Sequence, residues 1–178
     1  TLHQTTAAAI EKLGVRVVNT AQRRPILDAD VAALVWKAVK NILPQKLDYG
    51  LVLDGVRTQM SFDCYPCGAF FDTHSDAGHR LVDSGDISVF SFLLHLNGDY
   101  EGGELQFCDV DEWSGEGSDS GQSSRQARYT AGELALFSHD TVYRSAPVTS
   151  GSKYVIQGMV MYRHTRVSGR KEPARFRT

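Results

Sequence analysis

Cysteine is scarce in this chain, with three residues among 178. Cys64, Cys67 and Cys108 are too few, and odd in number, to form the disulfide framework of a small secreted protein. Cys64 and Cys67 have the spacing of a redox or zinc motif, but no second pair accompanies them, so we interpret them as incidental thiols. We therefore expect a reducing, intracellular setting, which we take to be the cytoplasm.

Strong net charge and long apolar runs are also missing. The chain has 19 Lys and Arg against 21 Asp and Glu, and a net charge of −2 argues against a general nucleic-acid binder. No apolar run approaches the length of a membrane span, which argues against a membrane protein. The chain begins at Thr1, without a methionine or a signal-peptide pattern, so we expect a trimmed or processed fragment.

The sequence does contain enough apolar residues, 42%, for one globular domain with a sizeable core. The N-terminal third predicts helical support for that core over residues 1–50. Thr5–Leu13 is alanine-rich and ends at Gly14, a brief strand is expected over Val15–Val18, and Asp28–Leu43 has apolar residues at helical spacing. Its apolar face is expected to consist of Val31, Leu34, Val35, Val39 and Ile42 and to pack on a sheet.

Strand patterns follow, separated by glycine turns, over 51–163. The predicted strands are Val56–Tyr65, Ala69–Thr73, Ile87–Leu96, Leu105–Phe107, Glu133–Ser138 and Lys153–Tyr162. Residues 109–126 are rich in Ser, Gly and acidic residues, which predicts a surface loop. Residues 164–178 form a basic tail that we interpret as a solvated segment. Many short strands with helices outside them indicate a sandwich or barrel.

One short segment carries a candidate metal site. His74 and Asp76 are two positions apart at the end of Tyr65–Asp76, and side chains at that spacing share a face of an extended strand. A neutral imidazole nitrogen and a carboxylate oxygen are two of the three ligands in the facial triad of non-heme iron(II) oxygenases. The pair alone is also common by chance, so the rest of the chain decides its meaning.

Several separated segments together resemble one family, the prolyl 4-hydroxylase-like iron(II)/2-oxoglutarate-dependent oxygenases. Tyr65, Gly68 and Phe70 before His74 and Asp76 look like the family's approach to its His-x-Asp motif. Further similarity lies in Leu93–Phe107 with its Asn-Gly and Gly-Gly-Glu turns, in Gly132–Phe137, and in Ala146–Tyr154. The resemblance implies a mainly β protein with N-terminal helices, whose core is a double-stranded β-helix, or jelly roll.

The resemblance also implies cofactors and their binding residues. The expected cofactors are Fe(II), 2-oxoglutarate and dioxygen, with ascorbate as an optional reductant. Lys153 would pair its ammonium with the distal carboxylate of 2-oxoglutarate, as a buried cation can. Tyr65 is the second candidate for that carboxylate, although burial as a core aromatic with a satisfied hydroxyl accounts for it nearly as well. His95 is interpreted as a satisfied core histidine.

The chain departs from the family at the third metal ligand. The family pattern places a histidine four residues before the Pro-Val pair and ten before the lysine, and this sequence has Tyr143 there. Tyr143 could bind as a phenolate, because a cation lowers the pKa of a coordinating phenol from about 10, but an anionic oxygen favours Fe(III) over Fe(II). Alternatively His139 supplies the imidazole, although four residues span roughly 13 Å of strand, or water fills the position. We favour Tyr143 at or near the metal, whether natural or engineered.

Two functions from different classes follow. The first is a dioxygenase that couples oxidative decarboxylation of 2-oxoglutarate to hydroxylation of an unactivated C–H bond, with a peptidyl proline or another amino-acid side chain as the first substrate guess by analogy. The second is a jelly-roll protein that binds metal and 2-oxoglutarate with little or no turnover, because Tyr143 replaces the histidine. A third and weaker idea, nucleic-acid demethylation, depends on the basic tail and predicts strongly salt-dependent binding.

Overall fold

A computed structural model describes residues 19–76, 86–108 and 125–165. Its larger sheet runs in the order β1 (Gln22–Leu27), β4 (Gln59–Pro66), β13 (Ser152–His164), β3 (Leu51–Val56) and β2 (Lys46–Leu47). Two more strands, β6 (Ile87–His95) and β10 (Leu134–Ser138), continue from β13. The 13-residue strand β13 pairs with β4 in its first half, with β3 in its second half and with β6 across its middle.

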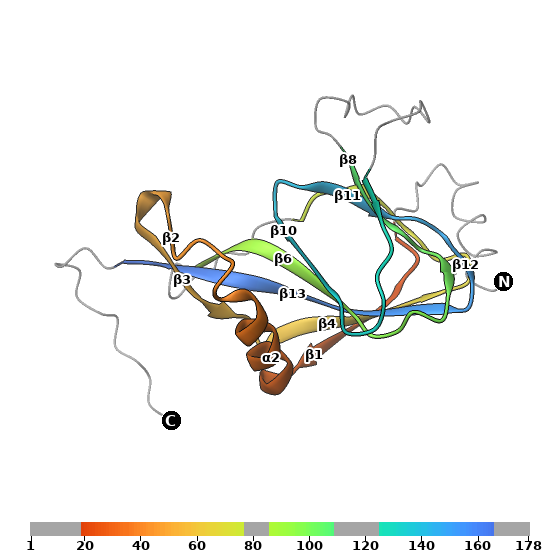
Figure 1. The fold of residues 1–178 in the computed structure, drawn as a ribbon, viewed down its shortest axis with the longest axis horizontal. Coiled ribbons are helices and arrows are strands. Elements are labelled where there is room, and N and C mark those ends of the chain that lie inside the picture. The colour runs from red at the N-terminus through yellow and green to blue at the C-terminus, as the bar shows by residue number, and fades with distance from the viewer. Residues whose placement is uncertain (1–18, 77–85, 109–124, 166–178) are drawn as a thin grey trace.

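The smaller sheet faces the larger one across a packed interior (Figure 1). Its order is β5 (Phe71–His74), β11 (Val142–Ser145), β8 (Leu105–Cys108) and β9 (Arg125–Ala127). A two-stranded sheet of β7 (Glu101–Gly102) and β12 (Val148–Ser150) closes one end. The pairs are antiparallel. Two facing antiparallel sheets confirm the prediction of a mainly β, jelly-roll fold.

Strand alternation divides the apolar residues between two core clusters. Phe92 of β6 and Ile156 of β13 belong to the cluster under helix α2 (Ala29–Val39). Their chain neighbours Leu93 and Val155 belong to the cluster between the sheets. Figure 1 shows α2 on the face of the larger sheet that is turned away from the smaller one. The interior between the sheets is therefore the part of the core in which a site can be enclosed.

Helix α2 is shorter than predicted and buries only part of its predicted apolar face. The Asp28 carboxylate accepts hydrogen bonds from the backbone N–H of Asp30 and Val31, which starts the helix where expected. The helix ends at Val39 instead of Leu43, and Leu34 and Ile42 are 63% and 72% exposed instead of buried. The sheet side is occupied by smaller residues, Ala32, Val35 and Val39, because they allow the helix to approach closely.

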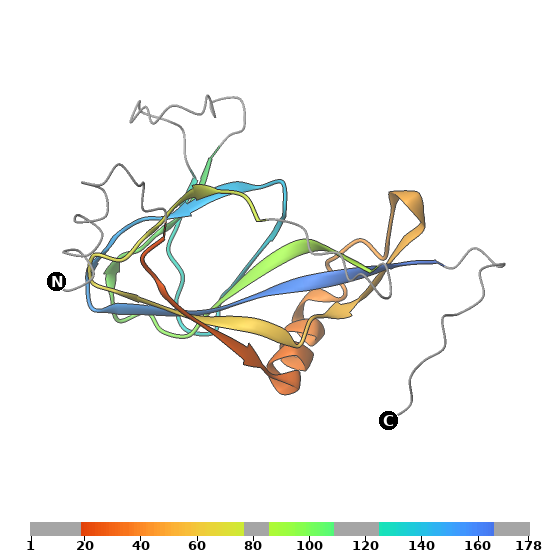
Figure 2. The same cartoon turned by 180° about the vertical axis from the view of Figure 1, so that it is seen from behind.

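The strand predictions differ from the structure mainly near the N-terminus. Strand Ile87–Leu96 is confirmed within one residue, and it is paired on both sides, by β10 and β13. Val56–Tyr65 is two strands, because Arg57 and Thr58 turn the chain between β3 and β4. Residues 22–27 are a strand within the region expected to be helical support. β1 was missed because its Gln-Arg-Arg-Pro start lacks apolar alternation, and it lies at a sheet edge next to β4 (Figure 2).

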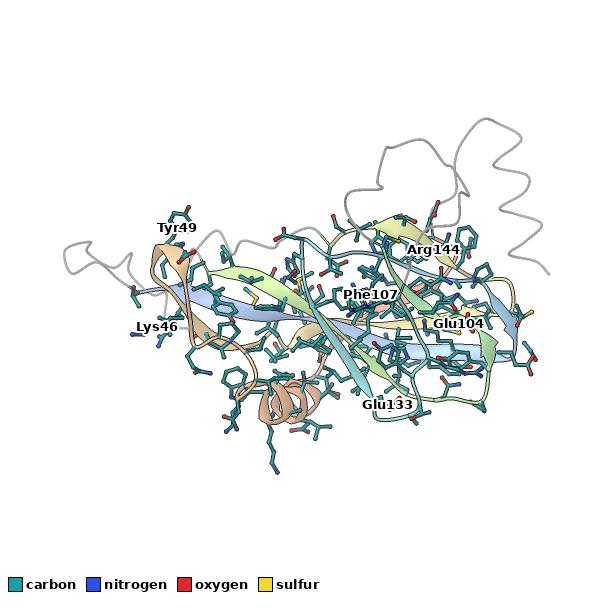
Figure 3. The ribbon with its side chains drawn as sticks, turned by 45° about the horizontal axis from the view of Figure 1, so that its top comes forward. Lys46, Tyr49, Glu104, Phe107, Glu133 and Arg144 are labelled. Atoms are coloured by element: carbon teal, nitrogen blue, oxygen red, sulfur yellow. The ribbon has the colours of Figure 1, made fainter. Side chains whose placement is uncertain are left out.

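Other predictions fall on residues that the structure does not describe. The helix Thr5–Leu13, the strand Val15–Val18, residues 109–124 of the predicted loop and most of the basic tail lie outside the described ranges. The last two residues of that loop, Arg125 and Gln126, instead begin strand β9, which pairs with β8. Between β2 and β3, the short 3-10 helix η1 (Asp48–Gly50) makes a hairpin tip, where Figure 3 shows Tyr49 away from the packed interior.

Candidate metal and 2-oxoglutarate site

His74, Asp76 and Tyr143 meet at one point between the sheets. Strand β5 pairs with β11 so that His74 lies opposite Tyr143. The Tyr143 hydroxyl donates a hydrogen bond to Asp76 Oδ1 over 3.1 Å, and His74 Nε2 lies 3.8 Å from the same oxygen. The His74 and Tyr143 rings are 4.4 Å apart between centroids. The structure thus brings together the three side chains that the sequence proposed as ligands.

The His74 ring is oriented for a ligand. Its Nδ1 lies 2.7 Å from the carbonyl oxygen of Asp72, and because a carbonyl only accepts, Nδ1 carries the proton and Nε2 presents its lone pair. Burial lowers the pKa of His74, which keeps the imidazole neutral. Nε2 is buried and has no hydrogen-bond partner among the described residues. A buried acceptor without a partner costs stability unless a ligand satisfies it, so this atom fits metal coordination.

Tyr143 occupies the position where the family resemblance led us to expect histidine. It is buried, and the centroid of its ring lies 4.6 Å from that of Phe137 and 6.4 Å from that of Phe107. Figure 3 labels Phe107 near Glu104 and Arg144. Burial, and then the adjacent Asp76 carboxylate, raise the pKa of Tyr143, so the phenol keeps its proton and donates it to Asp76. The alternative ligand His139 lies in the turn between β10 and β11.

The donor set fits iron with one unusual ligand. Within the described ranges no group of three His, Cys, Asp or Glu side chains lies close enough to hold a metal. The candidate site offers one imidazole nitrogen, one carboxylate and one phenol oxygen, from His74, Asp76 and Tyr143. These are donors that iron accepts, and the orphaned His74 Nε2 beside Asp76 is the observation that indicates a cation.

Lys153 lies deep in the same interior. Its side chain is 1% exposed, and its Nζ donates hydrogen bonds to the Gly103 carbonyl over 2.8 Å and to Ser145 Oγ over 3.4 Å. Burial lowers the pKa of Lys153 to about 8, an effect that nearby Glu104 partly opposes. A buried ammonium whose hydrogen bonds go to neutral oxygens favours an anionic ligand beside it.

Tyr65 lies beside this ammonium. It pairs with Lys153 across β4 and β13, and Lys153 Nζ is 5.1 Å from the centre of its ring. The Tyr65 hydroxyl shares a hydrogen bond with the Ser145 side chain. Burial raises the pKa of Tyr65, so its hydroxyl remains a donor. Tyr65, Ser145 and Lys153 together form a polar group at the end of the interior where a carboxylate could bind.

His95 differs in one respect from its prediction. It is buried, as expected, and stacks on Tyr129 with ring centroids 4.4 Å apart. It is not satisfied, however, because neither ring nitrogen has a hydrogen-bond partner among the described residues. Burial, and then the charge of Lys153, lower the pKa of His95 to about 3, so the ring is neutral over the physiological range.

Sequence reasoning missed Gln157, which contacts the candidate ligands, and Arg23, which contacts Gln157. Gln157 Nε2 donates to both oxygens of Asp76 over 3.3 Å, and Arg23 donates to Gln157 Oε1 over 2.6 Å. Alternation along β13 could have found Gln157, because it shares a face with Lys153. No local signal identifies Arg23, which reaches the site only through the pairing of β1 with β4.

The structure also describes the three cysteines and helix α2. Cys64, Cys67 and Cys108 all lie in described ranges, and none of them forms a disulfide. Cys67 Sγ donates to the Thr149 carbonyl oxygen over 3.2 Å. In the part of the chain that the structure describes, no helix is long and apolar enough to cross a membrane.

Comparison with known proteins finds relatives among the PKHD-type hydroxylases. A PKHD-type hydroxylase from Synechococcus sp. (strain JA-2-3B'a(2-13)) is 32% identical over 96 residues, which are 51% of this chain and 37% of that protein. The match thus spans little more than a third of the relative's length.

Solved structures of low identity show the same fold. A Pseudomonas putida prolyl-4-hydroxylase has a TM-score of 0.58 at 19% identity, over 92% of this chain and 84% of that chain. A Trichoplax adhaerens prolyl hydroxylase, solved with a peptide fragment of the hypoxia inducible factor oxygen degradation domain, has a TM-score of 0.57 at 16% identity, over 88% of this chain and 75% of that chain. The family model described as "2OG-Fe(II) oxygenase superfamily" matches residues 60–161, more than half of the sequence. The chain therefore belongs to the 2OG-Fe(II) oxygenase superfamily, a family of iron(II)- and 2-oxoglutarate-dependent oxygenases.

Proposed function

We propose that this chain is a dioxygenase that couples decarboxylation of 2-oxoglutarate to hydroxylation of an unactivated C–H bond. The observation that carries the proposal is the orphaned Nε2 of His74 beside Asp76, in the same interior as the buried ammonium of Lys153. One end of that interior offers cation ligands and the other an anion partner. Iron and a dicarboxylate ketoacid need this combination.

Each residue has a defined part in holding the cofactors. His74, Asp76 and Tyr143 would hold Fe(II), which supplies the activation of dioxygen when bound. Lys153 would pair with the distal carboxylate of 2-oxoglutarate, and Tyr65 would donate a hydrogen bond to it. The aromatic side chains around Tyr143 exclude water from the reacting atoms. Ascorbate would serve as an optional reductant that returns iron to Fe(II).

The substrate class follows by analogy. Among the similar proteins are a PKHD-type hydroxylase, a prolyl-4-hydroxylase and a prolyl hydroxylase in complex with a peptide. A peptidyl proline or another amino-acid side chain is therefore our first substrate, and the fold alone does not decide between them. We place the reaction in the cytoplasm, which the absence of a disulfide among the three cysteines supports.

The test is a single-turnover experiment. The protein is mixed anaerobically with Fe(II) and 2-oxoglutarate, then exposed to air, and succinate is measured with and without proline-containing peptides. We expect succinate, with more of it when an accepted peptide is present. A stable coloured iron–tyrosinate band without succinate would instead support the alternative, a metal- and 2-oxoglutarate-binding protein with little turnover. The family match does not favour that alternative.

Tyr143→His is the matching variant. We expect it to turn over 2-oxoglutarate faster, by roughly tenfold. A neutral imidazole stabilises Fe(II) better than the anionic oxygen that Tyr143 would present once a bound cation had displaced its proton. Tyr143→Phe is the control, because it keeps the aromatic ring and removes the oxygen. No gain in the histidine variant would contradict the idea that this position limits the rate.

A further inference from the structure

Gln157 holds the candidate carboxylate ligand in a fixed orientation. Its Nε2 lies 3.3 Å from Asp76 Oδ1, 3.3 Å from Asp76 Oδ2 and 3.4 Å from the Tyr143 hydroxyl. Gln157 is buried on β13, where its rotation is restricted by neighbouring strands. One amide donor thus lies against two of the three proposed metal ligands.

The direction of that amide is set by Arg23. The guanidinium donates to Gln157 Oε1 over 2.6 Å, and because a guanidinium has no acceptor, the amide oxygen must face Arg23. The NH₂ group therefore faces Asp76. A reversed amide would place two donors together at Arg23 and two acceptors together at Asp76.

Arg23 is itself anchored. Its Nε and Nη2 donate to the Asp63 carboxylate over 2.7 to 3.2 Å, and Asp63 is 0% exposed. Arg23 also lies over the Phe71 ring, 5.7 Å from its centre, and Phe71 stacks on His74 with centroids 3.6 Å apart. Strand β1 therefore supports both His74, through Phe71, and Asp76, through Gln157.

Gln157 is not needed to neutralise the buried charge of Asp63. Arg23 already binds both oxygens of Asp63, so that charge is paired without the amide. A neutral donor has a further property at Asp76. It orients the carboxylate without neutralising it, whereas a cation at the same place would compete with the metal.

We infer that Gln157, directed by Arg23, is a positioning residue that fixes the Asp76 carboxylate and the Tyr143 oxygen for the metal ion. This inference depends on the proposed metal site. It predicts that the Arg23–Gln157 pair sets the metal affinity and the coordination geometry, apart from any effect on turnover.

The experiment uses cobalt(II) as a spectroscopic probe of the intact protein without turnover. Gln157→Met keeps the Arg23–Asp63 pair and the side-chain length but removes the donor. We expect roughly tenfold weaker cobalt binding and an altered visible absorption spectrum, with the melting temperature close to that of the wild type. Gln106→Met is the matched control, because Gln106 is also a buried glutamine bonded to an arginine, Arg144, in the smaller sheet.

Arg23 is tested with its partner, because Arg23→Met alone would leave Asp63 buried and unpaired. Arg23→Met with Asp63→Leu removes the whole anchor, and we expect this double variant to bind cobalt more weakly than the wild type. Adding Gln157→Met to the double variant should weaken cobalt binding no further. If the wild type binds cobalt and Gln157→Met binds it with equal affinity and spectrum, the inference is wrong and the proposed function stands. If His74→Ala binds cobalt as well as the wild type does, the metal site itself is wrong.

Discussion

Lys153 is a cation enclosed in a core, and its environment makes the binding of an anion depend on pH. Burial lowers its pKa to about 8, so the free protein loses the ammonium as pH rises through that value. The unfolded chain keeps the proton up to its ordinary pKa of 10.5. Below about pH 8 the buried Lys153 ammonium therefore lowers the free energy of unfolding. This loss is relieved as the pH rises from about 8 to 10.5.

We predict that the affinity for 2-oxoglutarate is constant below about pH 8 and falls about tenfold per pH unit above it, because only the ammonium pairs with the distal carboxylate. Calorimetric titration between pH 7 and 9.5, with a non-redox divalent metal present, measures this. Lys153→Arg is the control, since a guanidinium stays charged throughout. A wild-type profile as flat as that of the arginine variant would show that Lys153 does not bind the carboxylate.

The residues predicted at the site were those that local spacing or position in a motif can identify. His74 and Asp76 follow from the two-residue period of a strand, and the structure brings Tyr143 to them. Arg23 and Asp63 are 40 positions apart in the chain and are joined by one strand pairing. No local pattern encodes that pairing, so Arg23 and Asp63 could not be predicted, whereas alternation along β13 could have found Gln157.

At the scale of elements, the turn between β7 and β8 shapes the 2-oxoglutarate end. Gly103 has φ +67°, and its carbonyl accepts the Lys153 hydrogen bond. A Cβ there would lie 2.9 Å from Val148 Cγ2 and 3.3 Å from Lys153 Cδ. The turn therefore needs glycine both for its backbone conformation and for the space beside Lys153.

Gly103→Ala should lower the free energy of unfolding by about 1–3 kcal/mol and weaken 2-oxoglutarate binding, because the methyl group displaces Lys153. Gly132→Ala is the matched control. Gly132 has φ +88° but no atom within 4 Å of its Cβ position, so it carries backbone strain alone. Denaturant unfolding and calorimetric titration compare the two. Equal loss of 2-oxoglutarate affinity in both variants would contradict the proposed contact.

Strands were predicted where apolar content was high and missed where only pairing defines them. β6 and β10 are apolar throughout much of their length and were predicted closely. β11 contains Tyr143, Arg144 and Ser145, and its strand character comes from pairing with β5 and β8 on either side. Tertiary context rather than intrinsic propensity forms such strands.

At the scale of the whole molecule, a buried histidine couples the folded state to acid. His95 has its pKa lowered to about 3 by burial and then by Lys153, whereas an unfolded chain has the ordinary value of 6.5. Below pH 6.5 the unfolded state binds a proton that the folded state excludes. Stability is therefore lost as the pH falls from 6.5 toward 3.

His95→Phe should remove this pH-dependent part of the free energy of unfolding. Between pH 7 and pH 4 the variant should therefore lose about 2–4 kcal/mol less stability than the wild type. Unfolding in urea at several pH values measures the difference. The exposed His164→Gln is the control for loss of a histidine. Parallel pH profiles for the wild type and His95→Phe would exclude His95 as the source of acid sensitivity.

The pairing of β13 has a consequence for the order of events during synthesis. β13 contributes to three pairings with strands that precede it in the chain, and it carries both Lys153 and Gln157. β4 and β6 each pair with β13 along one edge, through residues 152–157 and 155–162, so these two edges stay unpaired until those residues have left the ribosome. A nascent chain stalled before Ser152 would thus display unpaired strand edges and be a substrate for chaperones, while a chain released after His164 would gain its fold and both ends of its cofactor site in one step.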